Sequence, residues 1–197
     1  MSDTAGPAER PTLLDVEVDF DTIVANGALE LYDEEQVRAW FSGKRALTVR
    51  EVLEVRTHPG RLFWAIMRER VAPATVLRRM AIVMAREFLT RMVADGVYVD
   101  FRSSRALDTA KAYVDGEVSL GAMRVAAVKA AQAAVDVAEL DEPKVAAAAL
   151  VVDQALLPDA EEAVSQVFYT FVAWFGRRAD LHWLVDQARS VFGATAA

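Results

Sequence analysis

The sequence predicts an all-α fold, a compact multi-helix array with short loops between the helices. Apolar residues make up 54% of the 197-residue chain, which is enough to bury a sizeable core. Helix-capping patterns recur along the chain, and apolar side chains repeat at the spacing of a helix face. We therefore expect a single helical domain over residues 13–197, preceded by a disordered tail over residues 1–12.

The first ordered segment interrupts the helical pattern. In LDVEVDFD, residues 14–21, apolar and acidic side chains alternate with a period of two, which is typical of a half-buried strand. A second alternation, of Val97, Val99 and Phe101, offers a strand to pair with it. The sequence thus predicts one small extended or two-stranded element near the amino terminus. Alternatively, its acidic edge is free to pair with a strand of a partner protein.

A series of helices follows this segment. Three pairs of residues have the spacing of a capping box, in which a side-chain oxygen accepts a hydrogen bond from the first turn: Asp33 with Gln36, Thr48 with Glu51, and Asp159 with Glu162. Pro and Gly residues mark the breaks between helices. The expected helices span residues 33–43, 48–57, 60–71, 73–95, 104–115, 119–139, 142–157, 159–176 and 178–192.

The helix at 73–95 is expected to be central, because it is apolar on most of its sides. Its polar stripe of Arg78, Arg79 and Arg86 raises the question of nucleic-acid binding. Phosphate binding needs a positive face, whereas the chain carries a net charge of -7, so we interpret the stripe as solvated or paired with acids. The aromatic stripe of 159–176 is interpreted as core rather than as the lining of a ligand pocket.

Alanine occupies every fourth position from Ala122 to Ala138 in the helix at 119–139. Alanine is the best helix former, and a row of methyl groups lets a second helix approach closely. We expect the alanine-rich helix at 142–157 to pack there. The alternative is an exposed alanine face that receives a helix of a partner.

The charges are unevenly distributed along the chain. Residues 1–36 contain ten acids and one base, whereas residues 44–105 contain thirteen bases and six acids. One interpretation is an intramolecular clamp, in which the acidic region folds over the basic middle. The other is an acidic surface for a basic protein partner, with these candidate binding residues: Asp15, Glu17, Asp19, Asp21, Asp33, Glu34 and Glu35.

The residues that catalysis and metal binding require are scarce. The chain has no cysteine, so it has no disulfide, no thiolate metal site and no cysteine nucleophile. His58 and His182 are its two histidines, and His58 stands in a THPG turn. The sequence contains no Glu-x-x-His pair, no Gly-rich phosphate loop and no Gly-x-Ser-x-Gly elbow. We expect no catalytic residues, no metal and no cofactor, and thus no enzyme.

No segment has the pattern of a secretory signal or of a membrane span. The amino terminus lacks a basic stretch followed by an apolar one. The uncharged run from Ala163 to Gly176 is shorter than the roughly 20 apolar residues that a span needs. We expect a cytoplasmic protein that contacts no membrane.

Several segments between residues 76 and 150 resemble a known family. They are LRRMAIVMAREFLTRM, RALDTAKAYVDGEVSL, MRVAAVKAAQAA and KVAAAAL. In these the chain is similar to the all-helical, alanine-rich immunity proteins of bacterial polymorphic toxin systems. The resemblance implies a small cytoplasmic protein that binds and neutralises a cognate toxin without catalysis, and it carries no site residues. The alternatives are a structural or assembly protein and, third, an enzyme or ligand-binding helical domain.

Overall fold

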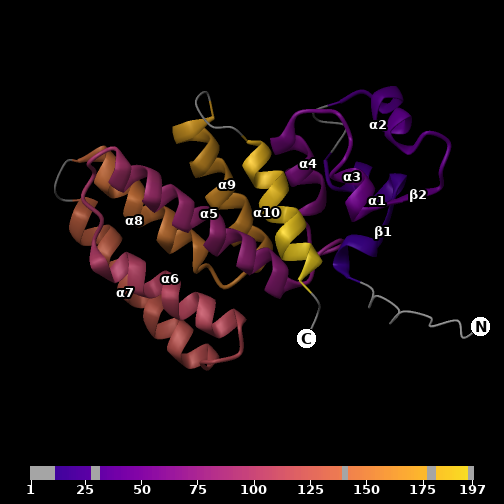
Figure 1. The fold of residues 1–197 in the computed structure, drawn as a ribbon. Coiled ribbons are helices and arrows are strands. Elements are labelled where there is room, and N and C mark those ends of the chain that lie inside the picture. The colour runs from indigo at the N-terminus through magenta and orange to yellow at the C-terminus, as the bar shows by residue number, and fades with distance from the viewer. Residues whose placement is uncertain (1–11, 28–31, 139–141, 177–180, 195–197) are drawn as a thin grey trace, which may run out of the picture. The chain divides into compact units, whose positions relative to one another are not determined.

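The computed structural model describes residues 12–27, 32–138, 142–176 and 181–194. This part of the chain is 72% helical, with ten α-helices and a small two-stranded antiparallel sheet near the amino terminus (Figure 1). The all-α prediction is therefore confirmed. The predicted tail over residues 1–12 lies outside the described residues, apart from Thr12.

The contacts of the chain group into two compact units. Unit 1 comprises residues 1–66 together with residues 182–197, and unit 2 comprises residues 67–181. The single domain expected over residues 13–197 stays a prediction.

Unit 1 contains the sheet and the shorter helices. Strand β1 pairs antiparallel with β2, and the buried side chains of Val18 and Leu47 stand opposite each other. The mate proposed at Val97, Val99 and Phe101 is wrong, because residues 97–100 form a loop and Phe101 begins a helix. The elements are η1 (Leu13–Asp15), β1 (Glu17–Asp19), α1 (Phe20–Ala25), α2 (Glu34–Phe41), β2 (Ala46–Thr48), α3 (Val49–Val52), α4 (Pro59–Ile66) and α10 (His182–Gly193).

Helix α1 replaces the last two residues of the predicted strand. The Asp19 side chain accepts a hydrogen bond from the Thr22 N–H at 2.8 Å, which caps a new helix. Phe20 and Asp21 therefore belong to α1 and not to an extended segment. The alternation of side chains thus predicts the strand correctly only over Glu17–Asp19, because Leu14 and Asp15 belong to the 3-10 helix η1.

Helix α10 packs on α4 and on η1, so both ends of the described chain contribute to the core of unit 1. Two polar contacts, one buried and one part-buried, join elements of unit 1. The Asn26 side chain donates to the Ala65 carbonyl at 2.8 Å, and Arg189 donates to the Leu53 carbonyl at 3.2 Å. Helices α3 and α4 end at Val52 and Ile66, several residues before the predicted ends at 57 and 71.

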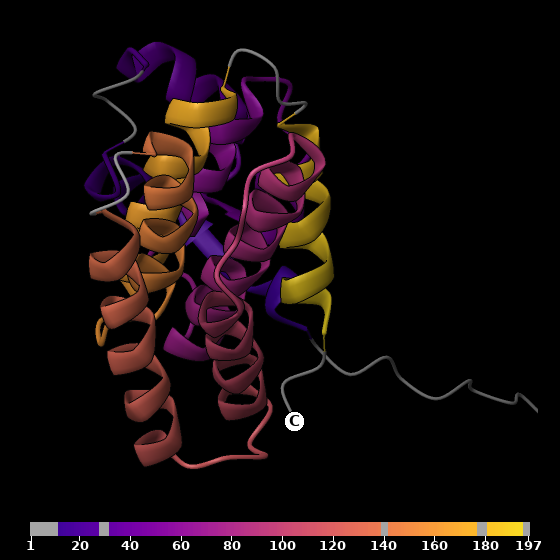
Figure 2. The same cartoon turned by 90° about the vertical axis from the view of Figure 1, so that its left-hand side faces the viewer.

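Unit 2 consists of five longer helices, each joined to the next by a short connection. Helix α5 contacts α6, α8 and α9, and α7 packs on α6 and α8. Figure 2 shows α6 and α7 side by side as an antiparallel hairpin. The elements are α5 (Ala74–Ala94), α6 (Phe101–Val114), α7 (Leu120–Ala138), α8 (Pro143–Ala155) and α9 (Ala160–Phe175).

Helix α5 lies in the core of unit 2, as its sequence predicts. Leu77, Met80, Met84 and Phe88 are fully buried. The Phe88 ring meets the ring of Phe175 edge-on, at 5.1 Å between centroids. The aromatic stripe of α9 is thus core over most of its length, although Trp174 stays 40% exposed.

The alanine row of α7 is buried only at its middle. Ala126 and Ala130 are buried, whereas Ala122 and Ala138 are exposed. A step of four residues exceeds one helical turn by about 40°, so a strict row of fours rotates out of the contact. The residues that α7 buries are instead Met123, Ala126, Ala130, Ala133 and Val137. Helix α8 packs on α7 as expected, and α6 packs on it as well.

Replacing Ala130 with leucine should overpack this contact, because Ala130 has no exposed surface. We expect Ala130→Leu to lower the free energy of unfolding by about 1–3 kcal/mol, measured by denaturant titration. Ala138→Leu makes the same change at an exposed position of the same helix and should stay within about 0.5 kcal/mol of the native protein. Equal effects of the two substitutions would contradict the packing described for α7.

Candidate functional site

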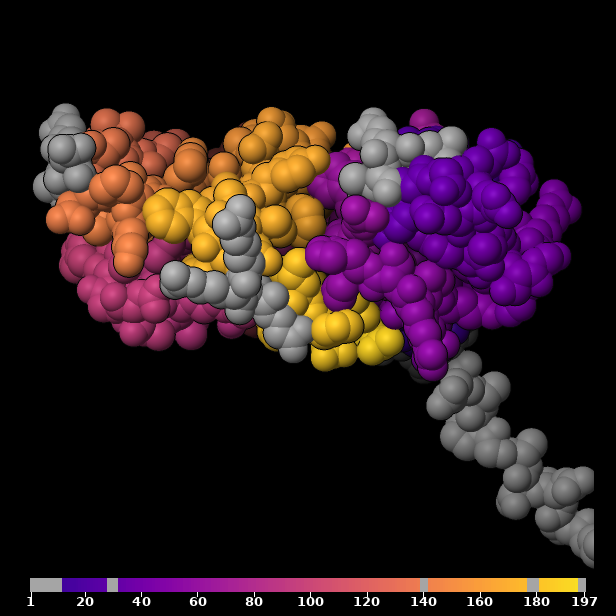
Figure 3. All heavy atoms as spheres, turned by 90° about the horizontal axis from the view of Figure 1, so that it is seen from above, coloured from indigo at the N-terminus to yellow at the C-terminus, as the bar shows by residue number. Residues whose placement is uncertain are grey.

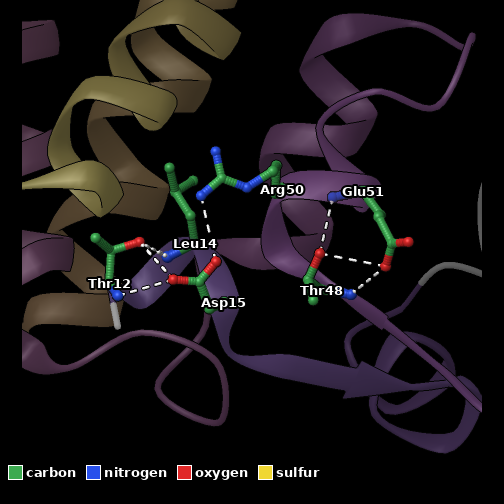
Figure 4. A network of polar contacts seen from close by, with 6 residues as sticks. All are labelled: Thr12, Leu14, Asp15, Thr48, Arg50 and Glu51. Carbon is green, nitrogen blue, oxygen red and sulfur yellow. Dashed lines mark hydrogen bonds and ion pairs between the residues drawn. The ribbon is translucent and has the colours of Figure 1, made fainter. Parts of the chain in front are cut away.

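Asp15, the first of the seven candidate acids, belongs to a capping box around η1. Its carboxylate accepts hydrogen bonds from the Thr12 N–H at 2.8 Å and the Thr12 hydroxyl at 3.0 Å, while that hydroxyl accepts from the Leu14 N–H (Figure 4). Arg50 donates to the other carboxylate oxygen at 3.2 Å. The Thr12 N–H and Arg50 together lower the pKa of Asp15.

A second capping box stands beside the first. The Thr48 hydroxyl accepts from the Glu51 N–H, and the Glu51 carboxylate accepts from the Thr48 N–H at 2.8 Å (Figure 4). Lys44 also donates to Glu51, and these bonds lower the pKa of Glu51 to about 2. The Val49 N–H donates to the Val16 carbonyl at 2.9 Å, so backbone and side-chain bonds together hold η1 against α3.

Three further candidate acids also have local partners. Asp19 caps α1, and Asp33 caps α2 by accepting from the Gln36 N–H at 2.7 Å. Glu34 forms an ion pair with Arg38 one turn later, at 2.7 Å. The Thr22 hydrogen bonds lower the pKa of Asp19. Each of these carboxylates is thus used in holding its own helix or turn.

The remaining three candidates differ. Glu17, Asp21 and Glu35 are exposed, and none has a hydrogen-bond or ion-pair partner for its side chain within the described residues. The seven acids lie on two stretches, residues 15–21 and 33–35. Figure 3 shows atoms of the amino-terminal, indigo to violet part of unit 1 at the surface. Of the seven candidate acids, Glu17, Asp21 and Glu35 are therefore the most accessible to a cation of a partner.

The two stretches are joined by aromatic contacts rather than by their carboxylates. The rings of Phe20 on α1 and Phe41 on α2 lie 6.0 Å apart. The Arg38 guanidinium stacks 4.1 Å above the Phe20 ring. Helix α2 therefore packs on α1 while the acids of its first turn stay exposed.

The arginine stripe of α5 is engaged inside unit 2. Arg79 pairs with Asp115 at 2.8 Å and Arg86 with Asp108 at 2.6 Å. Arg78 is buried, and its guanidinium donates to the carbonyls of Leu157 and Pro158 at 2.8 and 2.7 Å. The stripe thus pairs with acids, as interpreted, and it also holds the turn between α8 and α9. Of the intramolecular clamp, the described residues contain the Asp15–Arg50 pair of unit 1.

A groove of unit 2 contains a charged residue that sequence reasoning missed. Asp153 of α8 lines a groove of about 720 Å³ together with apolar side chains of α7 that include Leu120, Met123 and Val128. The carboxylate is half-buried and accepts no hydrogen bond from any described residue. Burial raises its pKa. A lone acid in an alanine-rich helix gives no signal in the sequence, because its burial depends on the packing of α7.

The two histidines lie outside this groove. His58 is exposed, and its carbonyl accepts from the Arg61 N–H at 3.0 Å at the start of α4. His182 is the first residue of α10. Within the described ranges, no three His, Asp or Glu side chains are grouped so that they could hold a metal ion. The expected absence of a metal, a cofactor and catalytic residues stays a prediction.

Comparison of the chain with protein-family models, with curated proteins and with solved structures finds no match. The resemblance to immunity proteins therefore stays a prediction from the sequence. Among the described helices, none combines the length and the apolar character needed to span a bilayer.

Two acids of one helical turn allow a direct test of their different roles. Asp33→Ala removes the cap of α2 and should lower the free energy of unfolding by about 1 kcal/mol. Glu35→Ala, two residues later, removes an unpaired carboxylate and should change it by less than about 0.5 kcal/mol. Denaturant titration of both variants measures this difference. A loss of stability in Glu35→Ala as large as in Asp33→Ala would show that Glu35 also supports the fold.

Asp153 should lower the stability of the folded protein at neutral pH. Because its pKa is higher in the folded than in the unfolded chain, the folded state binds more protons, and stability falls as pH rises through the carboxyl range. We expect Asp153→Asn to raise the melting temperature at pH 7 and to lose this advantage in acid, where the carboxyl is protonated in both states. Glu117→Gln, at an exposed loop position, is the control and should have no such effect. A lower melting temperature of Asp153→Asn at pH 7 would mean that the carboxylate has a stabilising partner.

Proposed function

We propose that the protein is a binding protein without catalysis of its own, and that it binds a basic protein partner through the acids of unit 1. The observation that supports the proposal most is the unpaired state of Glu17, Asp21 and Glu35 among the described residues. Exposed carboxylates without a cation keep their full negative potential for an incoming molecule. Asp15, Asp19, Asp33 and Glu34 add to this potential while they hold the fold.

Charges of this kind act mainly on the rate of association. A negative surface attracts a positive one before contact, and salt weakens the attraction beyond a Debye length of about 8 Å at physiological ionic strength. Binding should therefore slow as salt is added. The dissociation rate should change less, because it depends on the contacts made after docking.

The resemblance to immunity proteins suggests what the partner is. A toxin neutralised by direct binding would fit an acidic protein that acts through its surface and not through a reaction. In this proposal the partner is a basic toxin produced by the same cell. A structural or assembly protein with the same acidic surface would instead bind a basic partner that is harmless by itself.

Removal of the three unpaired charges tests the proposal without touching a cap. The variant Glu17→Gln, Asp21→Asn, Glu35→Gln keeps the shape of each side chain. The matched control, Glu69→Gln, Glu117→Gln, Glu142→Gln, removes the same charge from exposed positions of unit 2. Each protein would be immobilised and exposed to extract of the source cell, and the retained proteins identified by mass spectrometry.

We expect the native chain and the control to retain the same basic protein and to release it at high salt. The unit 1 variant should lose it while its melting temperature stays unchanged. The captured protein, expressed alone, should be toxic to cells, and co-expression of the native chain should relieve the toxicity. Retention of the same partner by all three proteins would refute the acidic surface as the binding site, and a harmless partner would refute the immunity role.

A further inference from the structure

Helix α7 has a second apolar face, opposite to the one that it buries. Val125, Val128 and Val135 are 57%, 69% and 59% exposed. The buried side of the same helix runs through Met123, Ala126, Ala130, Ala133 and Val137 and contacts α6 and α8. Helices in water normally present polar residues on the side that faces away from the core. Three exposed valines on that side indicate a surface that another molecule covers.

These valines follow the spacing of a coiled-coil seam. Val125, Val128, Gln132 and Val135 are separated by three, four and three residues, which is the a and d pattern of a heptad. The seam contains one polar residue, Gln132. A single polar residue at such a position is a known means of selecting register and partner at some cost in stability.

The apolar surface continues beyond α7. Phe101 at the start of α6 is 64% exposed, and it lines a groove of about 610 Å³ beside Val125 and Lys129. A helix placed on the seam would also cover part of this groove. The contact would then extend over two helices. A contact of this extent is needed for the buried area to exceed about 1,000 Å² in total, the size of a specific interface.

The charges beside the seam indicate the partner and its direction. Lys129 and Asp136 lie seven residues apart on one flank of the seam, and Arg124 lies on the other flank. In an antiparallel pair of identical helices, each flank faces the same flank of the second helix. The flank with Lys129 and Asp136 therefore meets a flank that carries the same two opposite charges. In a parallel pair the two flanks face each other, and Lys129 would meet Arg124 of the second copy. Among the charges of α7 itself, opposite charges thus meet only in the antiparallel arrangement.

We infer that two copies of this chain associate through the outer face of α7, with the two α7 helices antiparallel about a two-fold axis near the middle of the helix. The valines of the seam form the apolar centre of the contact. Lys129 of each copy faces the flank of α7 that carries Asp136 in the other copy. Asp136 already accepts hydrogen bonds from Arg102 and Gln132, which hold its carboxylate in place.

Sedimentation over a concentration series measures the association directly. The native chain should shift from monomer to dimer as its concentration rises. Val128→Asp places a charge in the seam and should raise the dissociation constant by about tenfold or more. Val93→Asp makes the same change at a 58% exposed valine of α5 and should leave the dimer unchanged. Circular dichroism of both variants checks that the helices stay folded.

Lys129→Glu distinguishes the two directions of the helix pair. In the antiparallel dimer it leaves only acids among the residues that α7 itself contributes to the self-facing flank, so the dimer should weaken several-fold. In a parallel dimer it would place the new carboxylate against Arg124 of the second copy and strengthen the association. Lys129 forms no ion pair with any described side chain of its own copy, so the change should not alter the fold.

Because the chain has no cysteine, a single one can be introduced as a marker. Gln132→Cys with a short bis-maleimide should give a covalent dimer, whereas Val93→Cys should give monomer. A native chain that stays monomeric at all concentrations would overturn the inference. So would a dimer that Val128→Asp leaves unchanged, or one that Lys129→Glu strengthens.

Discussion

The burial of α5 is the constraint on which unit 2 depends. Leu77, Met80, Met84 and Phe88 share one face of the helix and are all fully buried, and Ile82 and Leu89 are buried on a second side. Each such side chain contributes about 1.5–3 kcal/mol when it leaves water, so α5 must be covered on most of its circumference. Helices α6, α8 and α9 supply this cover. Helix α7 packs on α6 and α8, which leaves its outer face for another molecule.

The elements that could be predicted from the sequence are those that local chemistry determines. The boxes and caps at Thr48, Asp33 and Asp159 begin helices as expected, since each depends on residues three positions apart. The mate of β1 was predicted wrongly because pairing depends on which distant segment arrives beside it. The roles of Arg78 and Asp153 depend on packing. The sequence around Arg78 does not reveal the carbonyls beyond α8 that it binds, and the sequence around Asp153 does not reveal the apolar groove.

The candidate acids show, within a single site, which roles can be predicted from the sequence and which cannot. The capping role of Asp33 can be predicted, because its spacing to Gln36 is visible in the sequence. The capping role of Asp19 cannot be predicted, because the alternation around it favours a strand. Net charge alone treats all seven acids alike, whereas the structure divides them into carboxylates with local partners and carboxylates exposed without one.

Unit 1 is built from two segments that are far apart in the chain, and this has a consequence for the order in which the protein folds during synthesis. Helix α4 packs on α10, which begins only after all of unit 2 has been translated. At 5–20 residues per second, the ribosome adds the intervening stretch in roughly ten seconds. During that delay α4, with its buried residues Leu62, Phe63 and Ile66, lacks the helix that packs on it, so unit 2 is the first part of the chain that can complete its core. A nascent chain of this protein would therefore need protection at its amino-terminal end for longer than at its middle.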